Sequence, residues 1–209
     1  MTEIKDKSLQ VFLDELASKA STPGGGSAAA IMGAQSAALT SMVCNLTIGK
    51  ANYVEVEADM RILLQQSEAL RERLTALVKA DVEVFDQVMA AYGLPKDSDE
   101  QKTARSAAIQ TALKAATDVP LDCAKACAEA ITLSRIATEK GNVNLITDAG
   151  AAVMSAYAGL KTAALNVYIN LGAIKDSEFS DSRRATLNVL LEGVDIRSEE
   201  IYQRVVAKL

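Results

Sequence analysis

The chain of 209 residues contains no histidine and no tryptophan, and only 4% of its residues are aromatic. The absence of histidine excludes Ser-His and Cys-His nucleophile pairs, histidine-ligated zinc and an imidazole general base. Any acid or base must therefore be a carboxylate, a lysine, a tyrosine or a cysteine. Because aromatic residues are scarce while 49% of the chain is hydrophobic, we expect a core of Ala, Leu, Val and Ile.

Positive charge is also in short supply, since the formal net charge is -5 and the pI is near 4.9. Nucleic acids are bound by basic stripes, so we expect no nucleic-acid partner. A small anionic ligand held by a few local cations stays compatible with this charge. The N-terminus, Met1 to Leu16, has charges throughout and no apolar core followed by a cleavage site, so we expect a cytoplasmic protein without a secretory signal.

Cysteine is represented only by Cys44, Cys123 and Cys127, and each lies in a helical pattern. This arrangement is typical of reduced, buried thiols and not of a disulfide framework. Cys123 and Cys127 are spaced to face one side of a helix, but two ligands without histidine are too few for a usual zinc site. We therefore expect no metal.

Charge is missing altogether from Ala20 to Gly49, a stretch that opens with Thr22-Pro23-Gly24-Gly25-Gly26-Ser27. Proline and three glycines are unsuited to a helix interior, so a glycine loop is expected to lead into a long helix from Ser27 to Ile48. The run is long enough to span a membrane. However, it is rich in Ala, Ser, Gly and Thr and contains Gln35 and Asn45, which favours a buried central helix and no membrane partner.

Small residues recur every four positions along this central helix, at Ala29, Gly33, Ala37, Ser41 and Asn45. Such rows allow helix backbones to approach closely. The helix is therefore expected to pack against several others or against its own copy in a dimer.

The remaining periodicity is helical throughout, and no strand alternation is credible. We expect a single all-α domain over residues 1–209, a bundle of about six to eight helices around the long apolar one. Ser8 is the predicted N-cap of the first helix, and Pro120 is expected to kink or break a helix that starts near Glu100. The other predicted helices cover residues 52–92, 145–174 and, starting at Asp181 or Ser182, the chain to Leu209.

Asp81 is the strongest candidate for chemistry, because it falls on the same helical stripe as Leu74, Val78 and Phe85. A carboxylate on a core-facing side must be paired, protonated or lining a cavity. One interpretation is a buried ion pair or a cap to another helix. The other is a general acid or base whose pKa is altered by apolar surroundings.

Other polar groups suggest a binding site, although each has a structural alternative. Free amides in the loop of Gly24, Gly25, Gly26 and Ser27 suit a carboxylate or a developing negative charge, or the glycines simply permit close packing. Lys50 and Lys96, at helix ends, are placed to reach an anionic tail. The polar residues on one face of the predicted helix 145–174 either line a pocket or form hydrogen bonds with one another between packed helices. They are Asp148, Ser155, Thr162, Asn166 and Asn170.

Several runs together resemble the cyclodeaminase/cyclohydrolase family, most closely its stand-alone methenyltetrahydrofolate cyclohydrolases. They are Thr22 to Ser27, Asn45 to Lys50, Ala80 to Phe85, Leu94-Pro95-Lys96, Val119-Pro120-Leu121 and Asp148-Ala149-Gly150, with Asn166 and Asn170. The resemblance covers Ser8 to Leu209. It implies an all-helical homodimer that binds tetrahydrofolate derivatives without a metal or redox cofactor, with Asp81 at the position of the family's catalytic aspartate.

The resemblance implies hydrolysis of 5,10-methenyltetrahydrofolate to 10-formyltetrahydrofolate as the preferred activity. In this hypothesis Asp81 handles the proton of the attacking water, while Lys96, Asp148, Asn166 and Asn170 orient the substrate. A second hypothesis is cyclodeamination of 5-formiminotetrahydrofolate with release of ammonia. A third is a scaffold or folate-binding protein without catalysis, whose polar face is a dimer seam.

Overall fold

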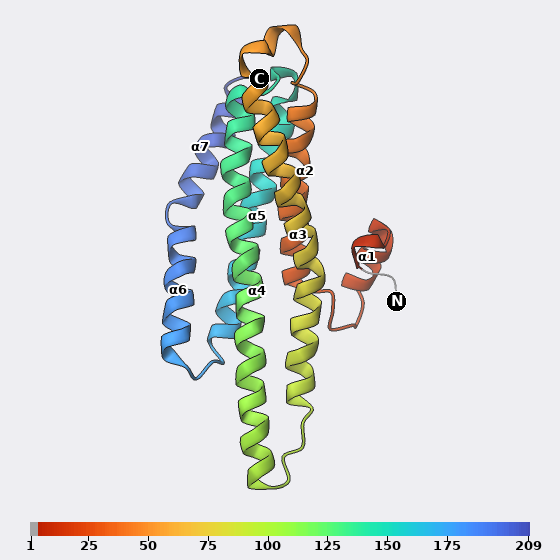
Figure 1. Cartoon of the computed structure of the whole chain (residues 1–209), viewed down its shortest axis with the longest axis vertical. Coiled ribbons are helices and arrows are strands. Elements are labelled where there is room, and N and C mark those ends of the chain that lie inside the picture. Colours follow the sequence, from red (N-terminus) through yellow and green to blue (C-terminus); the bar gives the residue numbers. More distant parts are fainter. Residues whose placement is uncertain (1–3) are drawn as a thin grey trace.

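The computed structural model describes residues 4–209, and within them it contains helices and no strands (Figure 1). The predicted all-α class is therefore confirmed. Short 3-10 turns lie at Ile4–Asp6, Ala51–Val56 and Val143–Leu145. The α-helices are α1 (Leu9–Leu16), α2 (Gly25–Asn45), α3 (Glu57–Tyr92), α4 (Asp99–Lys140), α5 (Ile146–Leu171), α6 (Ser177–Leu191) and α7 (Val194–Val206). Ser8 caps α1 as predicted, since its side chain accepts a hydrogen bond from the Val11 amide.

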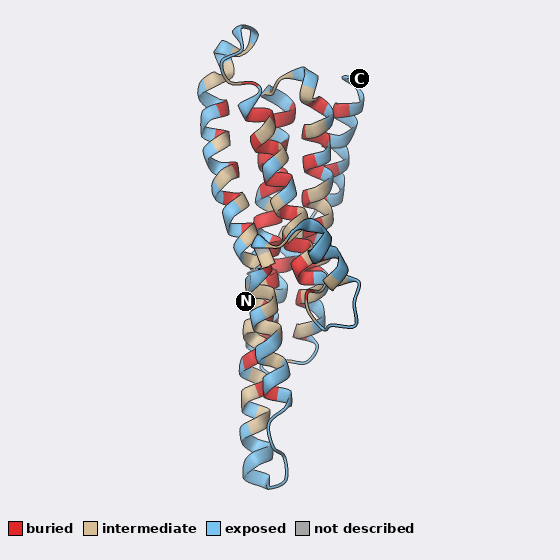
Figure 2. Ribbon diagram, turned by 90° about the vertical axis from the view of Figure 1, so that its right-hand side faces the viewer, coloured by how far each residue is buried: buried red, intermediate tan, exposed pale blue. Residues whose placement is uncertain are grey.

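Helix α2 forms the centre of the bundle and packs against α3, α4 and α5. Helices α6 and α7 cover the side of α4 and α5, and α1 lies on the opposite side (Figure 1). Buried residues are concentrated where α2 is enclosed, whereas α3 and α4 continue beyond it as a largely exposed hairpin (Figure 2). Helix α2 is long and apolar enough to span a membrane by length and composition, but 56% of that window is buried inside the fold.

The predicted row of small residues on α2 does bring backbones close together. A Cβ atom added to Gly159 of α5 would lie 3.0 Å from the Ala29 carbonyl oxygen and 2.9 Å from the Cys127 Sγ atom. One added to Gly33 would lie 2.8 Å from the same sulfur. Three helices therefore meet at Cys127 without room for another methyl group. The three cysteines are free and buried, as the sequence predicts.

Helix α2 begins two residues earlier than predicted, at Gly25, with Gly24 as its N-cap. Gly25 and Gly26 thus occupy the first helical turn and are not part of the preceding loop. The amides of a first turn have no partner within their own helix, so they are available to groups from elsewhere. In this protein, the group that meets the first turn of α2 is the Asp81 carboxyl group of α3.

Pro120 does not break α4, which continues from Asp99 to Lys140 and corrects the prediction of a kink or break. A proline has no amide to donate, so the carbonyl four residues earlier, that of Ala116, loses its usual helical partner. The side chain of Asn170 on α5 donates to this carbonyl from Nδ2 at 2.6 Å. A neighbouring helix thus satisfies the carbonyl that the proline leaves unpaired.

We predict that Asn170→Ala destabilises the protein by about 1–3 kcal/mol, because the carbonyl of the buried Ala116 would lose the donor that replaces the missing proline amide. In a Pro120→Ala background, the restored amide would bond Ala116 within α4, and Asn170→Ala should cost less. Urea unfolding of the four members of this cycle measures the coupling. An equal cost in both backgrounds would contradict the proposed role of Asn170.

The C-terminal region forms two helices, not the single one predicted from Asp181 or Ser182. Helix α6 starts at Ser177 because the Asp176 side chain caps it, accepting from the Phe179 amide at 3.0 Å. Gly193, with φ of 61°, lies between α6 and α7. This left-handed conformation suits glycine and interrupts the helix, so that α7 can change direction and pack against α5.

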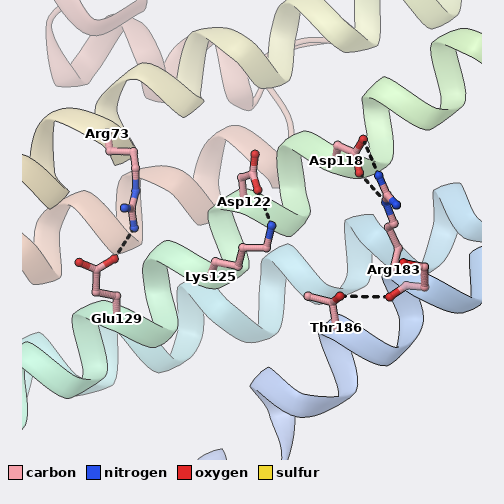
Figure 3. A network of polar contacts seen from close by, with 8 residues as sticks. Arg73, Asp118, Asp122, Lys125, Glu129, Arg183 and Thr186 are labelled. Carbon is pink, nitrogen blue, oxygen red and sulfur yellow. Dashed lines mark hydrogen bonds and ion pairs between the residues drawn. The ribbon is translucent and has the colours of Figure 1, made fainter. Parts of the chain in front are cut away.

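Ion pairs connect the helices on the outer surface (Figure 3). Arg73 of α3 pairs with Glu129 of α4, and Arg183 of α6 pairs with Asp118 of α4 at 3.0 Å. Lys125 pairs with Asp122 within α4. Exposed pairs of this kind contribute about 0–1 kcal/mol each, so the apolar contacts around α2 supply most of the stability.

Candidate functional site

Asp81 lies where α3 passes the first turn of α2. The Ser27 hydroxyl donates to Asp81 Oδ2 at 2.8 Å. A Cβ atom added to Gly26 would lie only 1.9 Å from Asp81 Oδ1, so the carboxyl group occupies the space that this glycine leaves free. The Asp81 side chain is half-buried, next to the buried part of its stripe at Leu74 and Val78.

The pKa of Asp81 is raised above the ordinary aspartate value, chiefly because burial disfavours the charged form. Hydrogen bonds from the side chain and backbone of Ser27 act in the opposite direction and lower it. No ion pair involves Asp81 within residues 4–209. Of the structural alternatives from the sequence, the helix cap is therefore realised and the ion pair is not. A role as general acid or base stays a prediction.

Asn166 of α5 completes a cluster around the start of α2. Its side-chain atoms lie 3.5 and 3.8 Å from where a Cβ atom of Gly25 would stand, and its Nδ2 atom donates to the Thr162 carbonyl at 3.0 Å. We call Gly25, Gly26, Ser27, Asp81 and Asn166 the Asp81 cluster. It combines a carboxyl group of raised pKa, a hydroxyl, an amide side chain and the amide end of a helix.

Five other predicted site residues lie outside this cluster within one chain, and one of them, Gly24, directly precedes it as the N-cap of α2. Asn170 is one turn beyond Asn166 and is engaged by Ala116. Asp148 is in the first turn of α5, about 27 Å along the helix from Asn166. Lys50 follows the far end of α2, which is about 30 Å long. Lys96 is exposed at the tip of the α3–α4 hairpin.

Two of the larger cavities lie away from the cluster. One of about 800 Å³ lies between α5 and α7, with Met154, Tyr157 and Ile196 in its walls, and contains no predicted site residue. The other, of about 420 Å³, includes Lys96 together with Lys102, Arg105 and Lys175. These last three cations were missed from the sequence, because Lys175 is about 70 positions from the other two and only the contact of the α5–α6 connection with α4 brings them together. Residues 4–209 contain no group of three or more Cys, Asp or Glu side chains arranged to hold a metal ion.

Comparison with known proteins finds similarity along nearly the whole chain. The family described as formiminotransferase-cyclodeaminase matches residues 8–189. A methenyltetrahydrofolate cyclohydrolase from Methylorubrum extorquens is 57% identical over 204 residues, which are 98% of each chain. The crystal structure of a formiminotetrahydrofolate cyclodeaminase from Thermotoga maritima aligns with a TM-score of 0.84 at 34% identity, covering 99% of this chain and 98% of that one.

Longer proteins contain the same unit as one part. A formimidoyltransferase-cyclodeaminase from Rattus norvegicus is 33% identical over 187 residues, which are 90% of this chain but 35% of that protein. The chain therefore spans about a third of the length of this relative. The Methylorubrum and Thermotoga proteins, by contrast, match it from end to end.

Proposed function

The chain belongs to the formiminotransferase-cyclodeaminase family, and on that basis we propose that it hydrolyses 5,10-methenyltetrahydrofolate reversibly to 10-formyltetrahydrofolate. It is an enzyme of the cyclohydrolase type, similar to the Methylorubrum protein over 98% of both chains. The observation that carries a chemical role is the half-buried Asp81 carboxyl, held by Ser27 and free of any ion pair within residues 4–209.

The proposed reaction demands little of the protein. The carbon between the two nitrogens of the substrate's cationic bridge is already electrophilic, so the enzyme has to position a water and move its proton. Asp81 takes a proton from the water as its oxygen bonds to the bridge carbon. The same carboxyl group returns that proton to the ring nitrogen as the carbon–nitrogen bond breaks, and the hydroxyl group on the former bridge carbon loses its proton to solvent as the formyl carbonyl forms. Neither step requires a metal or a redox cofactor.

The surroundings of Asp81 suit this exchange of a proton. A carboxylate with a raised pKa is a stronger base than an ordinary aspartate, and its protonated form persists to a higher pH. The Ser27 hydroxyl fixes Oδ2, and the glycines of the first turn of α2 leave the carboxyl group room. We propose that Gly24, Gly25, Gly26, Ser27 and Asn166 bind the substrate around it, with Asn170 supporting them from the next turn of α5.

A homodimer is part of the proposal, since Lys50 and Asp148 lie too far from Asp81 to share a site within one chain. Their predicted roles require a second copy. Helix α5 offers a surface for it, because Leu165 and Ile169 are 67% and 75% exposed on a helix that is otherwise largely buried. The molar mass from light scattering tests this: twice the chain mass of 22.1 kDa is expected, and a monomer would remove Lys50 and Asp148 from the site.

Cyclodeamination is the second candidate, favoured by the similarity to the Thermotoga and rat proteins. Asp81 would then protonate the leaving amino group, which departs as ammonia once the second folate nitrogen has bonded to the bridge carbon. The two activities separate in one experiment on the purified protein. We expect loss of methenyl absorbance well above the solvent rate, with ammonia release from 5-formiminotetrahydrofolate slower or absent.

The result of that experiment decides among all three hypotheses. Faster ammonia release than methenyl hydrolysis would reverse our assignment in favour of the deaminase. A protein that binds folate but leaves methenyl hydrolysis at the solvent rate would be the non-catalytic binding module, with Asp81 acting as a helix cap alone.

A further inference from the structure

The cavity of about 800 Å³ between α5 and α7 has no part in the proposed reaction. The two helices run in opposite directions (Figure 1), and a Cβ atom added to Gly150 of α5 would lie 3.1 Å from the Val205 side chain of α7. Two turns further along α5 and two turns back along α7 come Tyr157 and Ser198, which both line the cavity. The cavity thus lies beside a point of close helix packing, and its volume is typical of a small-molecule site.

Ser198 is a polar interruption in the buried stripe of α7, whose other members are Val194, Ile201 and Val205. Ser198 is only 2% exposed, and its Oγ atom has no hydrogen-bond partner within residues 4–209. The buried hydroxyl of Ser134, by contrast, donates to the carbonyl four residues earlier in its own helix. A buried hydroxyl without a partner is costly. Rotation about its Cα–Cβ bond lets the Ser198 hydroxyl pair with a polar atom that enters the cavity.

The walls around Ser198 are apolar. Met154 and Tyr157 of α5 and Ile196 of α7 contribute to them. Tyr157 packs against the main core, whereas Ile196 is 63% exposed and lies at the mouth. An aromatic ring and a thioether side by side make favourable contacts with another aromatic ring. These walls therefore suit a ligand with an aromatic body.

Negative charge gathers at the α7 side of the cavity. Asp195, Glu199 and Glu200 line it, and the cation that lines it, Arg204, pairs with Glu139 of α4 at 3.1 Å. Among the residues that the structure describes, Asp195 and Glu200 take part in no ion pair. Their charges are uncompensated and favour a cationic group on the ligand.

We propose that this cavity binds an arylalkylamine, an organic ammonium ion with an aromatic body. The ring packs against Met154, Tyr157 and Ile196, a polar atom of the ring system meets Ser198, and the ammonium group faces the carboxylates of α7. A metal ion would make no use of the apolar walls, and a neutral aromatic compound would leave the carboxylates uncompensated. The site is separate from the Asp81 cluster, because Tyr157 precedes Asn166 by about 14 Å along α5.

The test is calorimetry with tryptamine and with tryptophol, which has the same indole body but a neutral hydroxyl in place of the ammonium group. Wild type is expected to bind tryptamine about tenfold more tightly. The double variant Asp195→Asn with Glu200→Gln should lose this preference. Glu72→Gln with Glu178→Gln is the matched control and should keep it, since it removes two exposed carboxylates elsewhere, one of them also from the first turn of a helix.

Ser198→Ala examines the inner end of the site. Tryptamine should bind about three- to tenfold more weakly, because the indole N–H loses its acceptor. The denaturant midpoint should not fall, since no hydrogen bond within the fold is lost. A less stable variant would show that the hydroxyl has a partner inside the protein, which would overturn the inference.

The remaining outcomes also decide the question. Equal binding of tryptamine and tryptophol, or a preference that the control pair loses as well, would overturn the inference. So would an absence of saturable binding. If Ile196→Glu were then a monomer by light scattering while the wild type is a dimer, the occupant of the cavity would be a second copy of the chain.

Discussion

Asp81→Asn is expected to lower kcat for methenyl hydrolysis by about 10²–10⁴-fold, the usual contribution of a positioned acid or base. The asparagine oxygen can still accept from Ser27, so the contact with α2 is preserved while the group that exchanges a proton is lost. KM should change much less than kcat, because the shape of the site is retained. A methenyl absorbance assay of both proteins measures the difference.

The stability of the variant distinguishes catalysis from helix capping. The folded-state pKa of Asp81 is raised, so its contribution to stability is present below the unfolded pKa and is lost as the pH rises through the folded pKa. Above the folded pKa, the charged, half-buried carboxylate is therefore a cost that asparagine does not carry. We expect Asp81→Asn to unfold at the same or a higher denaturant concentration.

The same raised pKa shapes the pH profile of the wild type. Turnover should fall on the acid side with an inflection above that of an ordinary aspartate, since the base must be deprotonated to accept the water proton. The pH profile of Asp81→Asn should lack this decrease on the acid side. A folded variant with full turnover would exclude Asp81 as the acid or base, and a variant that loses turnover only by unfolding would leave it as a cap.

Local features of the fold were predictable from the sequence because they depend on neighbours within one helix. The stripe that contains Asp81 has a period of 3.6 residues, and Ser8 precedes an amphipathic segment. Both predictions agree with the structure. The all-α class follows from the same periodicity.

Features that depend on distant residues were predicted less well. The effect of Pro120 is decided by Asn170, 50 residues later, so no local rule could show that α4 continues. The partner of Asp81 is likewise a helix start 54 positions earlier, at Ser27. The positions of Lys50 and Asp148 relative to Asp81 depend on helix lengths and directions, which periodicity alone does not give. The cavity lined by Lys96, Lys102, Arg105 and Lys175 was not predicted for the same reason.

Gly26→Ala is expected to lower turnover by about 10²-fold or more while the protein stays folded. The new Cβ atom would lie 1.9 Å from Oδ1, 2.5 Å from Cγ and 2.9 Å from Oδ2 of Asp81, so the carboxyl group must move. The three nearest atoms all belong to this short side chain, so its movement can make room while α2 and α3 keep their places. Displacement of a catalytic group by about 1 Å is enough for such a loss.

Gly24→Ala is the matched control, since a Cβ atom there meets nothing within 4 Å and the φ of -136° suits any residue. Alanine retains the backbone amide through which Gly24 is proposed to bind the substrate, so kcat should be unchanged. Alanine favours a helical turn over glycine by about 0.5–1 kcal/mol, so Gly26→Ala should also unfold near the wild-type denaturant concentration.

In the double variant of Gly26→Ala with Asp81→Asn, the loss of turnover should be little larger than in Asp81→Asn alone, because both changes act on the same carboxylate. Fully additive losses would mean that Gly26 acts on the reaction by some route other than Asp81.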